Sequence, residues 1–148
     1  MDIYDRLGVE KIVNAQGNVT RIGGSLMSPA VLNAMVEASR HFVSIEDLDE
    51  KIGGRIADLM NVEAATICSG AAGGLLLAAA ACMAGSDEGK IDQLPNTTGM
   101  PNEFLAQSFQ GSPYSQSIRV AGGILTEIGG LTGAAEDEID RSISPKTA

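Results

Sequence analysis

The feature that most constrains the fold is a long run without charge, since no residue from Ala64 to Ser86 is acidic or basic. Such a run must be shielded from water, either in a protein core or in a bilayer. A membrane span is not expected, because Ser69-Gly70 and Gly73-Gly74 interrupt the run and the unbroken part, Leu75 to Ala84, is too short. The run is therefore interpreted as part of a folded domain and not as a membrane span.

Within this run the pattern changes from a strand to a helix across a glycine turn. Ala64–Cys68 is a short apolar run typical of a buried strand, Ser69-Gly70 is a turn signal, and Ala71–Met83 is rich in Ala and Leu. A glycine turn at a helix start presents backbone N–H groups and the positive end of the helix dipole, which suits a phosphate. The turn matches neither the Walker lysine motif nor the GxGxxG fingerprint, and close packing of a Gly/Ala helix on a sheet explains it equally well.

The rest of the chain alternates between helical and strand patterns. A helix is expected from Ser28-Pro29 to about His41, and a second from Ser44 to Asn61, with Asp47 as a capping-box partner. Further elements are expected at Glu103–Gln107 (strand), Tyr114–Ala121 (helix), Ile124–Ile128 (strand) and Ala134–Ile143 (helix), after a long connection from Gly85 to Asn102. This order indicates an α/β fold on a mostly parallel sheet, which three strands alone would leave incomplete.

The charge balance argues against one class of function. Of 148 residues, 10 are basic and 19 acidic, which gives a formal net charge of -9. Because affinity for nucleic acid comes mainly from Lys and Arg, a nucleic-acid partner is not expected. Cys68 and Cys82 lack metal-ligand spacing, so we expect two buried thiols in a reducing cytoplasm, and the first residues carry no secretory signal.

Short motifs along the whole chain add a family resemblance. They are YDRLGV at 4–9, VNAQG at 13–17, TRIGGSLM at 20–27, SGAAG at 69–73, LPNTTGM at 94–100, PY at 113–114, IR at 118–119 and AG at 121–122. Each motif is short, but the ordered set resembles the selenocysteine synthase-like family of fold-type I pyridoxal-phosphate enzymes. Within that family the chain is more similar to the sugar-acid ammonia-lyases than to the tRNA-acting selenium transferases.

The resemblance implies pyridoxal 5'-phosphate as the cofactor. Ser69, Gly70, Ala71 and Ala72 match the family's loop that holds the cofactor phosphate. Gln110 is a further candidate for cofactor contact: it stands where relatives usually have the histidine of a His-Arg pair, and its amide cannot titrate. No catalytic residue is assigned, because no lysine of the chain matches the cofactor lysine, and we expect the chain to stop before that residue.

The resemblance also implies a substrate site near the amino terminus. The Asn-Ala-x-Gly and Thr-Arg-x-Gly-Gly segments lie near the active site in that family, which makes Asn14, Thr20 and Arg21 candidates for substrate contact. The planar guanidinium of Arg21 suits a carboxylate or phosphate, and a surface or interface salt bridge is the alternative.

These expectations combine into one hypothesis. Residues 1–62 are expected to form an amino-terminal segment with two helices, and residues 63–148 the first part of a fold-type I large domain. The full-length protein is expected to be a cytoplasmic, homo-oligomeric lyase or transferase that acts on an amino acid or amino-sugar acid by β-elimination with loss of ammonia; the chain itself is expected to be inactive, without a membrane or metal partner. Two alternatives remain, a tRNA-dependent selenium transferase and a non-enzymatic remnant that binds an anion or a partner.

Overall fold

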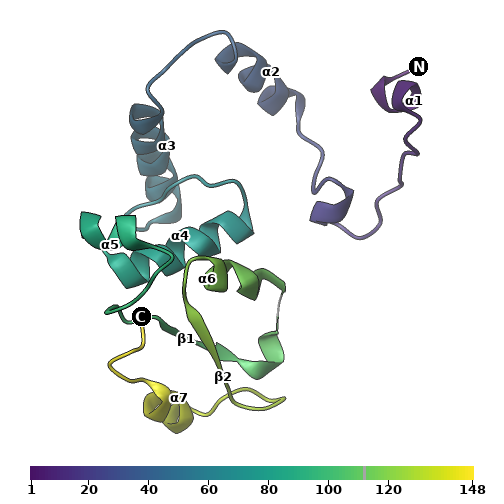
Figure 1. Ribbon diagram of the computed structural model, residues 1–148. Coiled ribbons are helices and arrows are strands. Elements are labelled where there is room, and N and C mark those ends of the chain that lie inside the picture. Colours follow the sequence, from purple (N-terminus) through teal and green to yellow (C-terminus); the bar gives the residue numbers. More distant parts are fainter. Residues whose placement is uncertain (112) are drawn as a thin grey trace. The chain divides into compact units, whose positions relative to one another are not determined.

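The computed structural model describes residues 1–111 and 113–148. Its internal contacts divide the chain into two compact units, Met1–Lys51 and Ile52–Ala148, each of which is described by itself (Figure 1). The division falls within helix α3, Ile45–Met60.

The first unit contains short helices held by their caps rather than by a core. Helix α1, Ile3–Leu7, which starts with a capping box, and the 3-10 helix η1, Thr20–Ile22, were both not predicted. Helix α2, Pro29–Ala38, begins where the sequence predicted, with the Ser28 hydroxyl accepting from the Val31 N–H at 3.4 Å, and ends slightly before His41. No described residue of this unit is buried, because the apolar faces of these helices find no opposing surface within it.

Helix α3 confirms its predicted limits. The Ser44 hydroxyl accepts from the Asp47 N–H at 3.1 Å, and Asn61 ends the helix with a left-handed φ of 52°. Gly53 is buried against the backbone carbonyl of Ala65, so that a Cβ at this position would collide with that oxygen. This close approach joins α3 to the segment that leads to the next helix.

The prediction of a strand at Ala64–Cys68 is wrong, because the described chain has no strand there. Its apolar composition is that of a buried strand, but a strand also needs a regular ladder with a neighbour, and the described strands pair with each other instead. The expectation of two buried cysteines is also wrong, since Cys68 and Cys82 are both exposed.

Two further helices follow, α4 (Ala71–Ala84) and α5 (Glu88–Gln93). Helix α4 has almost its predicted bounds, while α5 lies in the stretch that was expected to be a connection. The remainder of that connection is anchored, because the Thr97 hydroxyl donates to the carbonyl of Gly122 at 3.1 Å and accepts from the Asn102 amide at 2.7 Å. Among the described helices, none has the length and hydrophobicity needed to cross a membrane.

The sheet is small and parallel. Strands β1 (Glu103–Gln107) and β2 (Ile124–Ile128) have their predicted bounds and pair in register from Glu103 opposite Ile124 to Gln107 opposite Ile128. On the other edge of β1, Thr147 forms a parallel bridge with Glu103. The connection between the strands contains η2 (Ser108–Gln110), η3 (Pro113–Ser115) and α6 (Gln116–Val120), and α7 (Glu136–Ser142) follows β2.

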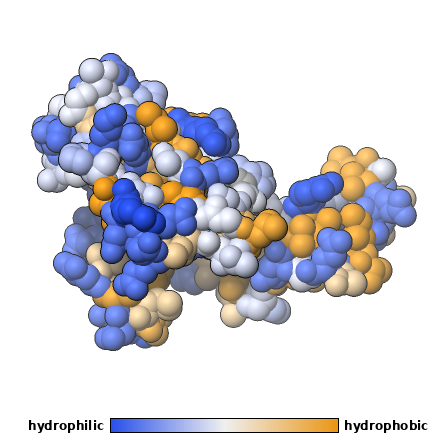
Figure 2. All heavy atoms as spheres, turned by 90° about the horizontal axis from the view of Figure 1, so that it is seen from below, coloured by the Kyte–Doolittle hydropathy of each residue, from blue (hydrophilic) through white to orange (hydrophobic). Residues whose placement is uncertain are grey.

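The core of the second unit lies between α4, α6 and the sheet. Its buried members are Ala79, Met83, Met100 and Ala121, with Phe104 and Ile118 among the half-buried residues packed against them. Many other apolar side chains stay exposed, and Figure 2 shows apolar patches, drawn in orange, on the face it presents. The arrangement is that of a mixed α/β fold with a small core.

Candidate phosphate-binding turn and amino-terminal hollow

The start of α4 is an uncapped helix amino terminus. Gly70 occupies the cap position with φ of 130° and ψ of 178°, a conformation open to glycine, and no side chain caps the helix. The first helical hydrogen bond runs from the Gly74 N–H to the Gly70 carbonyl at 2.9 Å, so the N–H groups of Ala71, Ala72 and Gly73 belong to the free first turn. With no acidic side chain in this turn, the positive end of the helix dipole stays uncompensated.

Two side chains from the preceding segment pack on this first turn. A Cβ built on Gly73 would lie 2.8 Å from the Ser69 hydroxyl oxygen, and one built on Gly74 would lie 3.3 Å from the Cys68 sulfur. The Cys68 thiol also donates to the Gly70 carbonyl at 3.3 Å. The glycines therefore make room for Ser69 and Cys68, whereas the sequence predicted room for an anion or close packing on a sheet.

The predicted cofactor contacts come from two places in the second unit. Ser69, Gly70, Ala71 and Ala72 form one contiguous exposed turn. Gln110 lies in η2, directly after the carboxyl end of β1, and is exposed. Ligands of α/β proteins bind at the carboxyl edge of the sheet, so the position of Gln110 is compatible with ligand contact.

Three hydrogen bonds organise this carboxyl edge, and none of them was predicted from the sequence. The Ser108 hydroxyl donates to the Ile128 carbonyl at 3.1 Å, which joins the ends of β1 and β2. The Gln107 amide oxygen accepts from the Ala134 N–H at 3.4 Å, and the Glu138 carboxylate accepts from the Gly129 N–H at 2.8 Å. These bonds fix the turn after β2 and dock α7 beside it.

The lysines of the chain are all exposed. The Lys11 ammonium contacts Asp2 at 2.9 Å and Asp5 at 3.0 Å, and these hydrogen bonds, that to Asp2 first, raise the pKa of Lys11 above its ordinary value. The other lysines are exposed, and Lys51 and Lys146 lie near carboxylates. A nucleophilic lysine must lose its proton, so the surroundings of Lys11 oppose that role.

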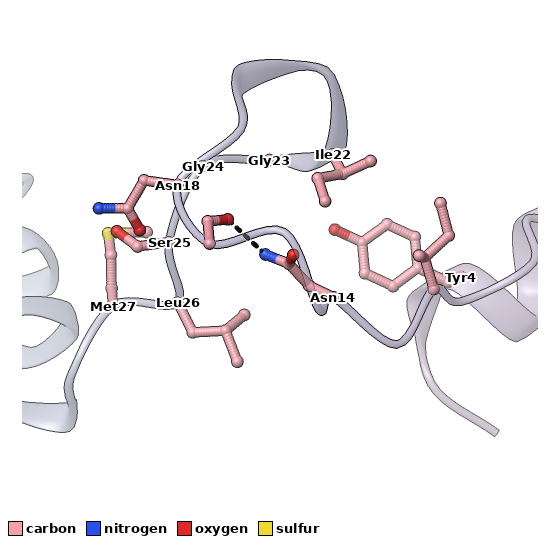
Figure 3. Close-up of a pocket in the computed structure, with 11 residues that line it drawn as sticks. Tyr4, Asn14, Asn18, Ile22, Gly23, Gly24, Ser25, Leu26 and Met27 are labelled. Atoms are coloured by element: carbon pink, nitrogen blue, oxygen red, sulfur yellow. Dashed lines mark hydrogen bonds between the residues drawn. The ribbon is translucent and has the colours of Figure 1, made fainter.

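The first unit contains a hollow of about 720 Å³, drawn in Figure 3, and one of the predicted substrate contacts lines it. Asn14 is that residue: its amide donates to the Gly17 carbonyl at 2.7 Å and accepts from the Gln16 N–H at 2.9 Å. These bonds hold a tight turn, so Asn14 shapes the wall of the hollow.

The other two predicted substrate contacts lie beside the hollow. Thr20 and Arg21 are exposed residues of η1, whose last residue, Ile22, belongs to the lining. The loop that carries them is closed by the Gly24 N–H donating to the Val19 carbonyl at 3.0 Å. The predicted cofactor and substrate contacts thus fall in different units of the chain.

Comparison with known proteins finds two curated enzymes to which the chain is similar. No family model matches the sequence. A 5'-C-glycyluridine monooxygenase-decarboxylase from a Streptomyces species is 35% identical over 98% of this chain, which covers 38% of that protein. The D-glucosaminate-6-phosphate ammonia lyase of Salmonella typhimurium (strain 14028s / SGSC 2262) is 32% identical over 99% of this chain, which covers 41% of that protein.

A comparison with solved structures also finds similarity to an ammonia lyase. The structure of a D-glucosaminate-6-phosphate ammonia-lyase matches the whole of this chain with a TM-score of 0.93 at 32% identity, and the match covers 41% of that protein. The expected similarity to a sugar-acid ammonia-lyase is confirmed, whereas similarity to a monooxygenase-decarboxylase was not expected. The chain spans 38% and 41% of the length of the two curated relatives.

Proposed function

We propose that this chain is the amino-terminal portion of a fold-type I, pyridoxal-phosphate-dependent lyase. The observation that carries the proposal is the uncapped start of α4, where the Ser69 hydroxyl lies beside a glycine-containing first turn. An anion is the ligand that such a helix start favours. Similarity to an ammonia lyase over 99% of the chain supports the assignment of that anion to a cofactor phosphate.

The described residues fit the phosphate end of the cofactor. The N–H groups of Ala71 and Ala72 and the Ser69 hydroxyl would donate to the phosphate, and Gly70 would leave space for it. Gln110 would offer an amide at the carboxyl edge of the sheet. When bound, the cofactor supplies an electron sink for negative charge at the α-carbon of an amino acid. We propose that the lysine which anchors it lies outside these 148 residues.

The names of the two curated relatives suggest a substrate class. One name specifies a glycyl group on uridine, and the other an amino-sugar acid, so both describe an amino acid that carries a sugar or a polyol. We propose a substrate of this class, whose carboxylate pairs with Arg21 and whose polar groups meet Asn14 or Thr20. The reaction would be a β-elimination with loss of ammonia in a cytoplasmic homo-oligomer.

A second candidate is an oxidative decarboxylation. It is favoured by the 35% identity to the monooxygenase-decarboxylase. A tRNA-dependent selenium transferase is disfavoured by the formal charge of -9, because tRNA binding needs a basic surface. The two retained reactions differ in products: an elimination of the full-length protein would release ammonia without consuming oxygen, and a monooxygenase-decarboxylase would consume oxygen and release carbon dioxide.

The phosphate site is tested by Ala71→Asp. An acidic residue in the first turn stabilises a helix, so this variant keeps α4 while placing negative charge beside the bound phosphate. We expect pyridoxal phosphate to bind at least about fivefold more weakly, which corresponds to ~1 kcal/mol of repulsion in water, and inorganic phosphate to compete for binding to the unaltered chain. Equilibrium dialysis measures both effects.

The matched control is Ala81→Asp, which places the same charge on an exposed position far along α4. It should leave binding unchanged, and Ser69→Ala should weaken binding without adding charge. Equal binding by the chain, Ala71→Asp and Ala81→Asp would show that the start of α4 holds no phosphate and would remove the basis of the proposed function.

A further inference from the structure

The hollow of the first unit has an uncharged lining. No acidic or basic side chain is among its described lining residues. Its polar side chains are the hydroxyls of Tyr4 and Ser25 and the amides of Asn14 and Asn18. Because a carboxylate or phosphate needs a cation or a set of N–H donors, this lining favours a neutral ligand.

Apolar side chains also line the hollow. They are Ile12, Ile22, Leu26 and Met27, and Figure 3 shows Tyr4 and Met27 toward opposite ends of the lining. A surface of this mixed kind suits a molecule that has both apolar C–H faces and hydroxyl groups. A purely apolar ligand would leave the hydroxyls and amides without partners, at a cost in binding free energy.

The backbone of the hollow is open to a ligand. Gly17, Gly23 and Gly24 line it with positive φ angles of 81°, 95° and 75°, and a Cβ at any of them would meet open space. The absence of side chains at these points lets a ligand approach the peptide groups. The antiparallel bridge between Val19 and Gly24 holds this wall in place.

We propose that the hollow binds a neutral, polyhydroxylated ring, either a free sugar or the sugar of a nucleoside. Its volume of about 720 Å³ is within the ~300–1,000 Å³ typical of small-molecule sites. The Asn18 amide and the hydroxyls of Tyr4 and Ser25 bond the ring hydroxyls, and the apolar residues cover its C–H face. The inference rests on the proposed function only in assigning this ring to the sugar part of the substrate.

The test uses the complete 148-residue chain and two neutral probes, uridine and methyl α-D-glucopyranoside. Ligand-observed NMR titration should show binding of at least one probe at millimolar concentration. Binding of uridine alone identifies a nucleoside sugar as the ligand, and binding of the glucoside alone a free sugar. The double variant Asn18→Ala/Ser25→Ala should weaken binding about tenfold, the effect of losing two neutral hydrogen bonds.

The controls separate this site from the phosphate turn. Asn33→Ala/Ser86→Ala removes an exposed amide and an exposed hydroxyl elsewhere and should leave binding unchanged. Ala71→Asp should also leave it unchanged, so loss of phosphate binding and loss of sugar binding are independent results. Absence of binding by both probes, or equal binding by the unaltered chain and by Asn18→Ala/Ser25→Ala, would overturn the proposal.

Discussion

At the scale of single residues, the start of α4 contains glycines both in the turn, at Gly70, and in the helix, at Gly73 and Gly74. Gly70 has a backbone conformation that other residues avoid, whereas Gly73 and Gly74 are helical and lie under the side chains of Ser69 and Cys68. The reasons for glycine therefore differ within one short motif. One is conformational, and the other is the space that two neighbouring side chains occupy.

This difference predicts opposite effects of one substitution on stability and binding. Gly73→Ala should stabilise α4 by up to ~1 kcal/mol through helix propensity, because only the movable Ser69 hydroxyl, 2.8 Å from the new Cβ, must yield. The displaced hydroxyl should then contribute less to phosphate binding. Urea unfolding and phosphate titration measure the two effects, and a variant that binds phosphate as well as the unaltered chain would show that the hydroxyl is not a ligand.

The amino-terminal carboxylates give a second residue-scale prediction. Hydrogen bonds from backbone N–H groups, with a smaller contribution from Lys11, lower the pKa of Asp2 and Asp5 below their ordinary values. Lys11→Met should raise both pKa values without restoring them fully, because the capping-box bonds remain. NMR titration of the two carboxylates measures the change, and a full return to ordinary values would show that Lys11 is the main cause.

The pH dependence of α1 follows from the direction of these shifts. A carboxylate whose pKa is lowered on folding contributes stability above its unfolded pKa and loses it as the pH falls through the folded value. The cap of α1 should therefore loosen in acid. The raised pKa of Lys11 acts in the opposite direction, so its contribution is present at neutral pH and lost only in strong base.

At the scale of elements, α3 contains two adjacent glycines in different surroundings. Gly53 is buried against the Ala65 carbonyl, while a Cβ on Gly54 would meet open space. Gly53→Ala should destabilise the chain by ~1–3 kcal/mol, because a backbone carbonyl cannot move aside as a side chain can. Gly54→Ala should stabilise it by ~0.5–1 kcal/mol through helix propensity.

Urea unfolding of the two variants measures both changes. The pair forms its own control, since each variant adds the same methyl group to the same helix one residue apart. Equal changes in the free energy of unfolding would mean that α3 does not pack on the segment around Ala65. The glycine at position 53 would then not be explained by this contact.

At the scale of the whole molecule, the buried core is small for the apolar content of the chain. The buried hydrophobic residues are Ala57, Ala79, Met83, Ala84, Met100 and Ala121, none of them bulkier than methionine. Helix α4 is apolar on all sides, yet Leu75 and Leu77 are 40% and 49% exposed. A helix of this kind is normally covered on every face, so this surface favours association.

We therefore expect the isolated chain to self-associate. Sedimentation velocity over a range of protein concentrations should show species larger than a monomer, and Leu77→Glu, which places a charge on the exposed face of α4, should reduce them. Asn33→Glu adds the same charge on an exposed position of α2 and should have a smaller effect. A monodisperse monomer that unfolds cooperatively would contradict this expectation.

Local sequence signals determined most elements of this protein. Ser28, Ser44 and Asn61 mark helix limits through side-chain caps and a left-handed turn, which are properties of a few neighbouring residues. The bounds of β1 and β2 follow from short apolar runs between turn residues. The turn of Ser69 and Gly70 before an apolar helix was visible for the same reason.

Only the tertiary structure decided which residues each element contacts and which of its side chains are buried. It formed no strand at 64–68, because a strand needs a regular ladder of hydrogen bonds as well as an apolar composition. It exposed both cysteines and placed Ser69 over Gly73, since burial and side-chain contacts depend on what surrounds a residue in space. The uncharged hollow around Asn14, Asn18 and Ser25 arises in the same way, from a folded loop that brings separate polar and apolar residues to one surface.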